Sequence, residues 1–148
     1  MEECANEILS GLWLGNISDA KNKEFISSLD LVINCSKDIP FLSKNTKNIR
    51  IPIDDNLEEK EIKNLFKFLP KVTSYIHSAL NNNKNILVHC YAGKQRSASV
   101  IVAYLIRYLN ISLEKAILLV KSKRIIIFTP CINFKRALLK FEKEFRKK

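Results

Sequence analysis

Short runs of apolar residues along the chain predict four β-strands. Two of these runs are almost wholly apolar, which is typical of strands covered on both faces of a sheet. The predicted strands are Leu12–Gly15, Leu31–Cys35, Asn48–Ile53 and Ile86–His89.

Apolar residues at spacings of three and four predict helices between and after these strands. The predicted helices are Ser18–Leu29, Leu57–Leu80, Arg96–Leu109, one that begins after an N-capping Ser112, and Phe134–Phe145. Pro70 lies inside the second of them, and a proline there removes a backbone donor and crowds the preceding turn. We therefore expect a kink at Pro70 or a break into two helices.

The alternation of strands and helices predicts an α/β fold, with a small sheet flanked by helices. Most of the helices follow the last predicted strand. A chain of 148 residues suits one compact domain, which we expect to span residues 1–148.

The chain is strongly basic, with 25 Lys and Arg against 15 Asp and Glu and a formal net charge of +10. Acidic residues concentrate in Asp54–Glu61, whereas Asn133–Lys148 holds seven basic residues and two acidic ones. A solvated face of the last helix accounts for this charge without further function. The alternative is contact with polyanions such as phosphoproteins, anionic lipid or RNA, and charge alone does not choose among them.

The cysteines and the N-terminal sequence favour a reducing compartment such as the cytoplasm. The four cysteines, at positions 4, 35, 90 and 131, form no CxxC pair and no cluster with a histidine, so neither a zinc site nor a disulfide framework is indicated. The N-terminal sequence has no basic region followed by an apolar stretch, unlike a secretory signal. Val100–Ile106, the longest apolar run of the C-terminal half, is far too short to cross a bilayer. The abundance of Lys, Asn and Ile is typical of an AT-rich genome, such as that of a virus or a parasite.

The segment 86–97 is the part of the sequence that most clearly indicates a functional site. A buried strand is expected to end at Cys90, and a helix to begin near Gln95 or Arg96. The intervening turn would gather backbone N–H groups at a helix N-terminus, which is a good site for a dianionic phosphate. Cys90 would then lie at the base of an anion-binding loop formed by Tyr91, Ala92, Gly93, Lys94, Gln95 and Arg96.

The side chains of this segment suit phosphate chemistry. The positive field of the turn favours the thiolate of Cys90, which would be a nucleophile at neutral pH. Arg96 could hold two phosphate oxygens in a planar fork that lysine does not offer. Gly93 permits a backbone turn that a side chain would obstruct. Ser97 could hydrogen-bond the sulfur as it leaves, and His89 is expected to order the loop rather than to act as an acid or base.

The spacing of these residues is more informative than any one of them. A Cys and an Arg six apart are expected by chance roughly 0.2 times in a chain of this composition, so that pair alone is weak evidence. A preceding His, a Gly three residues after the Cys and a Ser after the Arg lower the chance expectation by several orders of magnitude. A buried Cys and a surface Arg at an ordinary strand–helix turn would explain fewer of these features.

The segment His89–Ser97 matches the pattern HCxxGxxRS and so resembles the cysteine-based protein phosphatases, in particular those of dual specificity. Glu7–Gly15 resembles the opening strand of these enzymes, and Leu31–Cys35 resembles their second buried strand. Ser112–Glu142 resembles their last two helices, including the stretch Lys121-Ser122-Lys123-Arg124. The resemblance implies a central, mostly parallel sheet of about four to five strands with helices on both sides. It implies neither a metal nor an organic cofactor.

The resemblance also implies a general acid. Ile51–Asn56 is similar to the general-acid loop of these enzymes, and the family pattern places the acid at Asp55, with Asp54 as the alternative. A carboxylic acid there could protonate the leaving oxygen and later activate water. By its residues alone, this segment would be interpreted as a solvated turn before a helix.

One departure from the family pattern lies before the last helix. Members often carry Asn after the proline of this loop, where it is thought to brace the phosphate loop, whereas here Cys131 follows Pro130. This leaves open how the loop is braced. We interpret Cys131 as a filler of the loop, with oxidative pairing to Cys90 as the alternative.

Three classes of phosphate ester fit this chemistry. The chain starts almost directly at the first strand and lacks the long N-terminal region of tyrosine-specific relatives. We therefore expect a shallow pocket that admits phosphoserine and phosphothreonine as well as phosphotyrosine. Lys94 resembles the second lysine of the phosphoinositide phosphatases, whose loop reads HCKAGKxR, but Tyr91 replaces the first. The basic charge is consistent with an RNA 5′-phosphatase, although Ser97-Ala98 stands where those enzymes have Thr-Gly. We rank phosphoproteins first, phosphoinositides second and RNA third.

A different class of protein is a module that binds phosphoproteins without turnover. Non-catalytic relatives usually lose the cysteine, whereas Cys90, Arg96 and Asp55 are all present here. We therefore expect an enzyme with phosphoprotein substrates as its partners. The sequence leaves the oligomeric state open, with a homodimer as one alternative.

Overall fold

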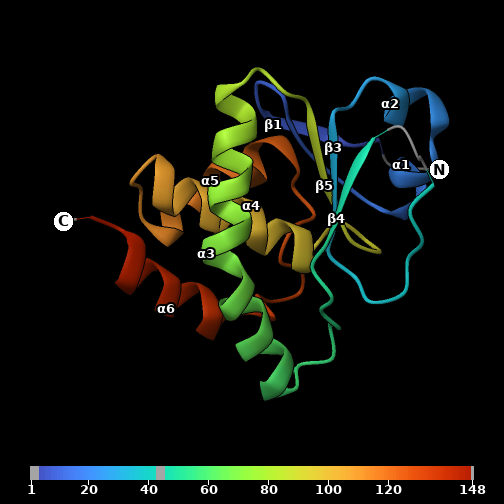
Figure 1. Ribbon diagram of the computed structural model, residues 1–148. Helices are drawn as coiled ribbons and strands as arrows, with labels where there is room; N and C mark the ends of the chain where they lie inside the picture. The colour runs from blue at the N-terminus through green and yellow to red at the C-terminus, as the bar shows by residue number, and fades with distance from the viewer. Residues whose placement is uncertain (1–3, 43–45, 148) are drawn as a thin grey trace.

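The computed structural model describes residues 4–42 and 46–147, which fold around a five-stranded sheet (Figure 1). The strands are β1 (Asn6–Leu9), β2 (Leu12–Gly15), β3 (Leu31–Asn34), β4 (Lys47–Arg50) and β5 (Ile86–His89). Their order across the sheet is β1-β2-β5-β3-β4. β1 pairs with β2 in antiparallel fashion, whereas the β2–β5, β5–β3 and β3–β4 pairs are parallel. The prediction of a mostly parallel sheet of about four to five strands is confirmed. The domain expected over residues 1–148 includes 1–3, 43–45 and 148, which lie outside the described residues.

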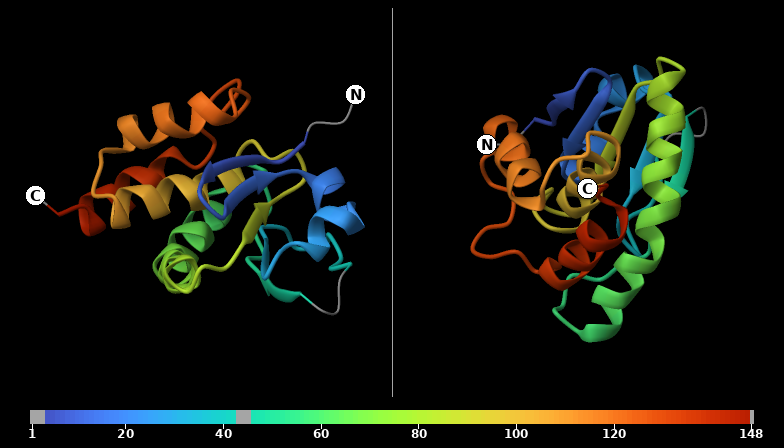
Figure 2. Two further views of the ribbon diagram at one scale, coloured as in Figure 1. Left: turned by 90° about the horizontal axis from the view of Figure 1, so that it is seen from above. Right: turned by 90° about the vertical axis from the view of Figure 1, so that its left-hand side faces the viewer.

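Helices cover both faces of this sheet. They are α1 (Ile17–Lys21), α2 (Lys23–Ser27), α3 (Glu59–Asn81), α4 (Arg96–Tyr108), α5 (Leu113–Lys123) and α6 (Lys135–Phe145). Figure 2 shows α1 and α2 on one side of the sheet and the four longer helices on the other. Across the described residues, every helix is too short or too polar to cross a membrane.

The two faces of the sheet have separate cores because successive strand residues point to opposite sides. Ile33 and Val88 belong to the large core beneath α3, α4, α5 and α6. Val32 and Leu87, their neighbours in sequence, belong to the smaller core beneath α1 and α2. β5 lies at the centre of the sheet with all four of its residues buried. Its C-terminal end is therefore fixed from both sides.

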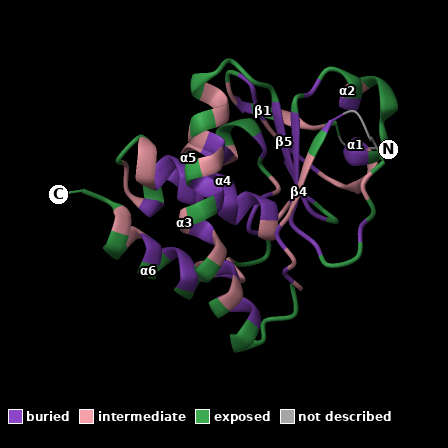
Figure 3. Ribbon diagram, viewed as in Figure 1, coloured by how far each residue is buried: buried purple, intermediate pink, exposed green. Residues whose placement is uncertain are grey.

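α4 occupies the middle of the larger layer. Every residue from Ser97 to Ile106 is buried, and the helix is purple along most of its length in Figure 3. A helix that is buried all round must be enclosed by other elements, and α3, α5, α6 and β5 pack against it. The N-terminus of α4 is thus held in a fixed position relative to the end of β5.

Two predicted boundaries were wrong near the N-terminal half of the sheet. The predicted helix Ser18–Leu29 is two short helices, because Asn22 ends α1 and caps α2 by accepting a hydrogen bond from the Phe25 amide at 3.1 Å. The predicted strand Asn48–Ile53 ends at Arg50. The predicted strand Leu12–Gly15 is confirmed as β2. The segment Glu7–Gly15, which resembles the opening strand of the family, holds a hairpin of β1 and β2 turned at Gly11, whose φ of +85° suits glycine.

The predicted break at Pro70 does not occur, since α3 runs as one helix through this residue. Two carbonyl groups beside the proline accept hydrogen bonds from side chains. Thr73 Oγ1 donates to the Leu69 carbonyl at 2.7 Å, and Arg107 Nη1 of α4 donates to the Pro70 carbonyl at 2.7 Å. The guanidinium of Arg107 also lies over the rings of Tyr108 and Phe145. The bond from Arg107 joins α3 to α4 beside the proline, and α3 packs against both α4 and α6.

Replacement of Arg107 tests how much its contacts with α3 stabilise the fold. Because Arg107→Ala removes a charged donor from a half-buried carbonyl, we expect it to lower the free energy of unfolding by about 2 kcal/mol, as measured by urea denaturation. Arg146→Ala is the matched control, since its pair with Glu142 is long, at 4.0 Å, and exposed. We expect that control to change stability by less than about 0.5 kcal/mol. Equal effects of the two changes would contradict the role given to Arg107.

Candidate active site

The predicted phosphate loop lies between the end of β5 and the start of α4. Cys90 follows β5 directly and is 2% exposed, so its thiol lies at the floor of the turn rather than at its rim. Tyr91 is 63% exposed at the outer edge. α4 begins at Arg96, with Gln95 in the N-cap position. The strand, turn and helix therefore occur in the order and at the residues that the sequence predicts.

Four consecutive carbonyl groups of the loop, those of residues 91–94, accept hydrogen bonds from residues outside it. The Tyr91 carbonyl accepts from the Ile17 amide at 3.0 Å, and the Lys94 carbonyl accepts from the Phe128 amide at 2.9 Å. Between them, the carbonyls of Ala92 and Gly93 accept from Arg124, at 3.4 Å and 2.9 Å.

Each of these peptide bonds is trans, so the N–H of the next residue points opposite to the carbonyl. The four outward carbonyls therefore turn the N–H groups of residues 92–95 toward the space above Cys90. A concave set of N–H groups of this kind is an anion-binding site.

Arg124 binds the phosphate loop, although no role was predicted for it from the sequence. It ends α5, is 3% exposed, and also donates to Asn6 Oδ1 of β1 at 2.8 Å. Gly93 allows its approach, because a Cβ at Gly93 would lie 2.7 Å from Arg124 Nη2 and 2.6 Å from the Gly15 carbonyl oxygen. Gly93 also has a φ of +67°, which favours glycine. The only signal in the sequence was the likeness of the segment 121–124 to a family helix, which gave Arg124 no role.

Arg96 reaches from the first turn of α4 toward the predicted acid loop. Its Nη1 donates to the Ile53 carbonyl at 2.9 Å. Within the described part of the chain, its Nε is buried and has no hydrogen-bond partner. A buried guanidinium nitrogen without a partner is costly unless a ligand satisfies it. The unpaired Nε therefore suits an arginine that binds an anion.

Ser97 and His89 flank the thiol. Ser97 Oγ lies 3.1 Å from Cys90 Sγ, and both side chains are buried. His89 is also buried, and its Nδ1 is 3.4 Å from the Cys90 carbonyl oxygen. Because a carbonyl oxygen can only accept, the ring nitrogen is the donor in this pair. Burial lowers the pKa of His89 from its usual 6.5 to about 4, and the nearby guanidinium groups of Arg50 and Arg96 also lower it. A neutral imidazole that packs beneath the loop fits the ordering role predicted for His89.

Cys35 follows the neighbouring strand β3 and lies near Cys90. Its amide donates to the His89 carbonyl at 2.8 Å, immediately after β3. Burial raises the pKa of the Cys35 thiol well above its usual value, and the nearby Cys90 raises it further. Cys4 and Cys131 are exposed, and all four cysteines are free thiols. In residues 4–42 and 46–147, no three His, Cys, Asp or Glu side chains form a group that could hold a metal ion.

Gln95 braces the loop on the side of the last helix. Its Nε2 donates to the Cys131 carbonyl at 2.7 Å, and its Oε1 accepts from the Asn133 amide at 3.0 Å. The segment after Pro130 is therefore joined to the phosphate loop although it lacks the Asn of the family pattern. The backbone of this segment and the side chain of Gln95 supply the contact instead, and residue types alone do not reveal such a contact.

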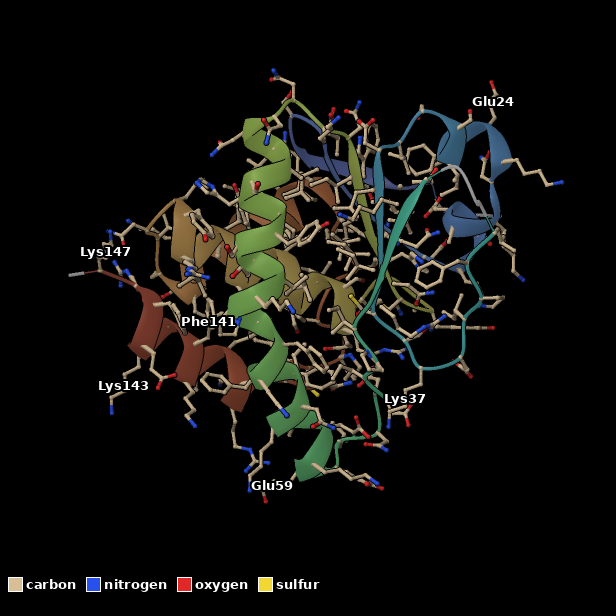
Figure 4. All side chains as sticks on the ribbon, in the orientation of Figure 1. Glu24, Lys37, Glu59, Phe141, Lys143 and Lys147 are labelled. Carbon is tan, nitrogen blue, oxygen red and sulfur yellow. The ribbon has the colours of Figure 1, made fainter. Side chains whose placement is uncertain are left out.

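The two candidate acids have different surroundings. Asp54 forms an ion pair with Lys37 at 3.2 Å, and its amide donates to Glu61 Oε1 at 3.2 Å. Glu61 is 1% exposed and binds Lys37 at 2.7 Å, which lowers the pKa of Glu61. Figure 4 labels Lys37 near the segment between β4 and α3. Asp55, in contrast, accepts from Asn133 Nδ2 at 2.9 Å. Asp54 is therefore tied to the surface near β3, and Asp55 to the segment that braces the phosphate loop.

Comparison with known proteins agrees with this arrangement. The sequence profile of the dual specificity phosphatase catalytic domain matches residues 12–144. Human dual specificity protein phosphatase 9 is 39% identical over 145 residues, which cover 95% of this chain and 36% of that protein. Putative tyrosine phosphatase 123R of invertebrate iridescent virus 6 is 36% identical over 139 residues, which cover 93% of this chain and 91% of that protein.

Solved structures agree as well. The crystal structure of human DUSP28 superposes with a TM-score of 0.87 and 26% sequence identity, and the match covers 99% of this chain and 98% of that one. The chain belongs to the dual specificity phosphatase family. It spans little more than a third of the length of the human relative, at 36%, and most of the viral one, at 91%.

The low pKa of His89 predicts how stability depends on pH. Above about pH 6.5 the imidazole is neutral in both the folded and the unfolded chain, and it then costs no stability. As the pH falls from 6.5 toward about 4, only the unfolded chain takes up the proton, so stability is lost. We expect this group to account for a loss of about 2 kcal/mol between about pH 7 and about pH 5.

Urea denaturation of the wild type and of His89→Gln at both pH values measures this contribution. The variant starts from a lower stability because it disturbs a buried position, but its further loss on acidification should be smaller by about 2 kcal/mol. The same loss in both proteins would mean that His89 is not buried in its neutral form.

Proposed function

We propose that this chain is a protein phosphatase that hydrolyses phosphotyrosine and phosphoserine or phosphothreonine monoesters through a phosphocysteine intermediate. The observation that carries the proposal is that four consecutive carbonyls of the loop after Cys90 bind donors outside the loop, from which we infer that the N–H groups of residues 92–95 face the space above Cys90. The unpaired Nε of Arg96 supports it, since both features suit a phosphate dianion. Family membership and the names of the relatives support the choice of protein substrates.

In the first step, the Cys90 thiolate attacks phosphorus. The sulfur–phosphorus bond forms as the bond from phosphorus to the substrate oxygen breaks, and the loop amides and Arg96 stabilise the three equatorial oxygens. Asp55 gives its proton to the departing oxygen, since an alkoxide or phenoxide leaves poorly. The products are the dephosphorylated substrate and phosphorylated Cys90.

In the second step, water attacks the phosphocysteine. Asp55, now ionised, takes a proton from the water, and the sulfur–phosphorus bond breaks to release inorganic phosphate. The Ser97 hydroxyl, 3.1 Å from the sulfur, can donate a hydrogen bond to the thiolate as it leaves. The proton balance over both steps leaves the enzyme unchanged.

We also propose that the protein works in a reducing compartment such as the cytoplasm, because the mechanism needs a free thiolate at Cys90. The basic end of α6 would attract acidic phosphoproteins. Lys143 and Lys147 project from this end into solvent, away from the sheet (Figure 4). Such exposed charges chiefly raise the rate of encounter with a partner of opposite charge.

Phosphate release from a matched panel of substrates tests the proposed function. The panel holds a phosphotyrosine peptide, a phosphothreonine peptide, a phosphoinositide and 5′-triphosphate RNA. We expect turnover of both peptides to exceed that of the lipid and the RNA. Preference for lipid or RNA would retain the chemistry and overturn the class of substrate.

The variant Cys90→Ser tests the nucleophile in the same assay. We expect it to reduce turnover to the background rate, because a serine hydroxyl in this loop is far less ionised than a thiol. Binding of tungstate, a phosphate analogue, should persist, since the loop amides and Arg96 are unchanged. Appreciable turnover by the variant would show that Cys90 is not the nucleophile. Persistent binding by a wild type that releases no phosphate would indicate a binding module.

A further inference from the structure

Asn133 joins the phosphate loop to the predicted general acid. Its backbone amide donates to Gln95 Oε1 at 3.0 Å, and Gln95 is the N-cap of the helix that carries Arg96. Its side-chain Nδ2 donates to Asp55 Oδ1 at 2.9 Å. One residue thus connects a loop that follows β5 with a loop that follows β4, although these segments are about forty residues apart in sequence.

The orientation of the Asn133 amide is fixed by its two partners. The Cys131 thiol lies 3.4 Å from Asn133 Oδ1 and can donate to it. On the other side, the Asp55 carboxylate can only accept, so it must face the NH₂ group. Nδ2 toward Asp55 and Oδ1 toward Cys131 is therefore the orientation in which both contacts are satisfied.

This contact distinguishes the two oxygens of Asp55. Oδ1 is occupied by the Asn133 donor, so a proton on Asp55 is carried by Oδ2. A general acid must present its proton toward the leaving oxygen with little freedom of rotation, since misplacement of the donor slows proton transfer. In the described part of the chain, Asn133 is the side chain that hydrogen-bonds the Asp55 carboxylate.

The remainder of the acid loop is already held by other residues. Arg96 binds the Ile53 carbonyl, and Glu61 binds the Asp54 amide. These bonds fix the backbone on the N-terminal side of Asp55 but leave its own side chain free to rotate. Asn133 supplies the contact that they do not.

We propose that Asn133 is a positioning residue that sets the rotamer of Asp55, so that the oxygen carrying the proton faces the leaving group. This inference rests on the proposed function, because it requires Asp55 to be the general acid.

The test compares substrates whose leaving groups differ in their need for a proton. Phenyl phosphate has a poor leaving group, whereas dinitrophenyl phosphate has a good one that departs without protonation. General acid catalysis contributes about 10²–10⁴-fold, and imperfect positioning of the acid should forfeit part of it. We expect Asn133→Ala to lower kcat/KM for phenyl phosphate by about tenfold and to change that for dinitrophenyl phosphate by less than about twofold.

The design separates positioning from general damage. Asn133→Ala retains the backbone amide that binds Gln95, so the brace of the phosphate loop is preserved. Arg136→Ala is the matched control, since it removes a contact with Glu59 at 3.2 Å from the same region without touching Asp55. We expect this control to leave both substrates unaffected. The double variant Asp55→Asn with Asn133→Ala should be no slower than Asp55→Asn alone, because Asn133 acts only through Asp55.

Two results would overturn the inference while the proposed function stands. One is an equal fall of kcat/KM for both substrates in Asn133→Ala, and the other is a further loss in the double variant. If the wild type is active but Asp55→Asn lowers kcat/KM equally for both substrates, Asp55 is not the general acid. The inference about Asn133 would then fail as well. Failure of the proposed phosphatase chemistry is distinct, since the wild type would then release phosphate from neither compound.

Discussion

The structure depends on a loop in which four consecutive carbonyl groups bind donors from outside the loop. A backbone that gathers its N–H groups around an anion cannot satisfy its own carbonyls within the loop, so their partners must come from elsewhere in the fold. Here the partners are the Ile17 amide, the Phe128 amide and the guanidinium of Arg124. Arg124 contributes most, because one planar group with several donors serves two neighbouring carbonyls and also reaches β1. The shape of the proposed anion site thus depends on contacts from several parts of the domain.

The same requirement explains the layout of the sheet around the site. β5 is the central strand, and its neighbours β2 and β3 end beside it, so Gly15 and Cys35 lie against the loop. α4 is enclosed on all sides, which fixes its N-terminus over Cys90. A strand end and a helix start that are both buried leave little freedom to the turn that joins them. The buried scaffold therefore constrains the shape of the loop.

Local features of the chain were well predicted from the sequence, and long-range ones were not. The segment 86–97 holds its strand, turn and helix in consecutive residues, so pattern and spacing were sufficient. Asn22 and Pro70 show the limits of local reasoning. A helix cap divided one predicted helix, whereas another runs continuously through its proline, beside which Arg107 of α4 binds. The contacts of Arg124 and Asn133 join residues that are more than thirty positions apart. Their residue types are ordinary for a helix end and a loop, so only the fold reveals what they bind.

The central claim is that Cys90 becomes covalently phosphorylated during turnover. Mass spectrometry of the protein, denatured while it turns over para-nitrophenyl phosphate, tests this claim most directly. We expect a fraction of the protein to gain the mass of one phosphoryl group, and digestion to locate that group on Cys90. Turnover with the phosphoryl group on another residue, or with Cys90 unmodified at every time point, would contradict the account.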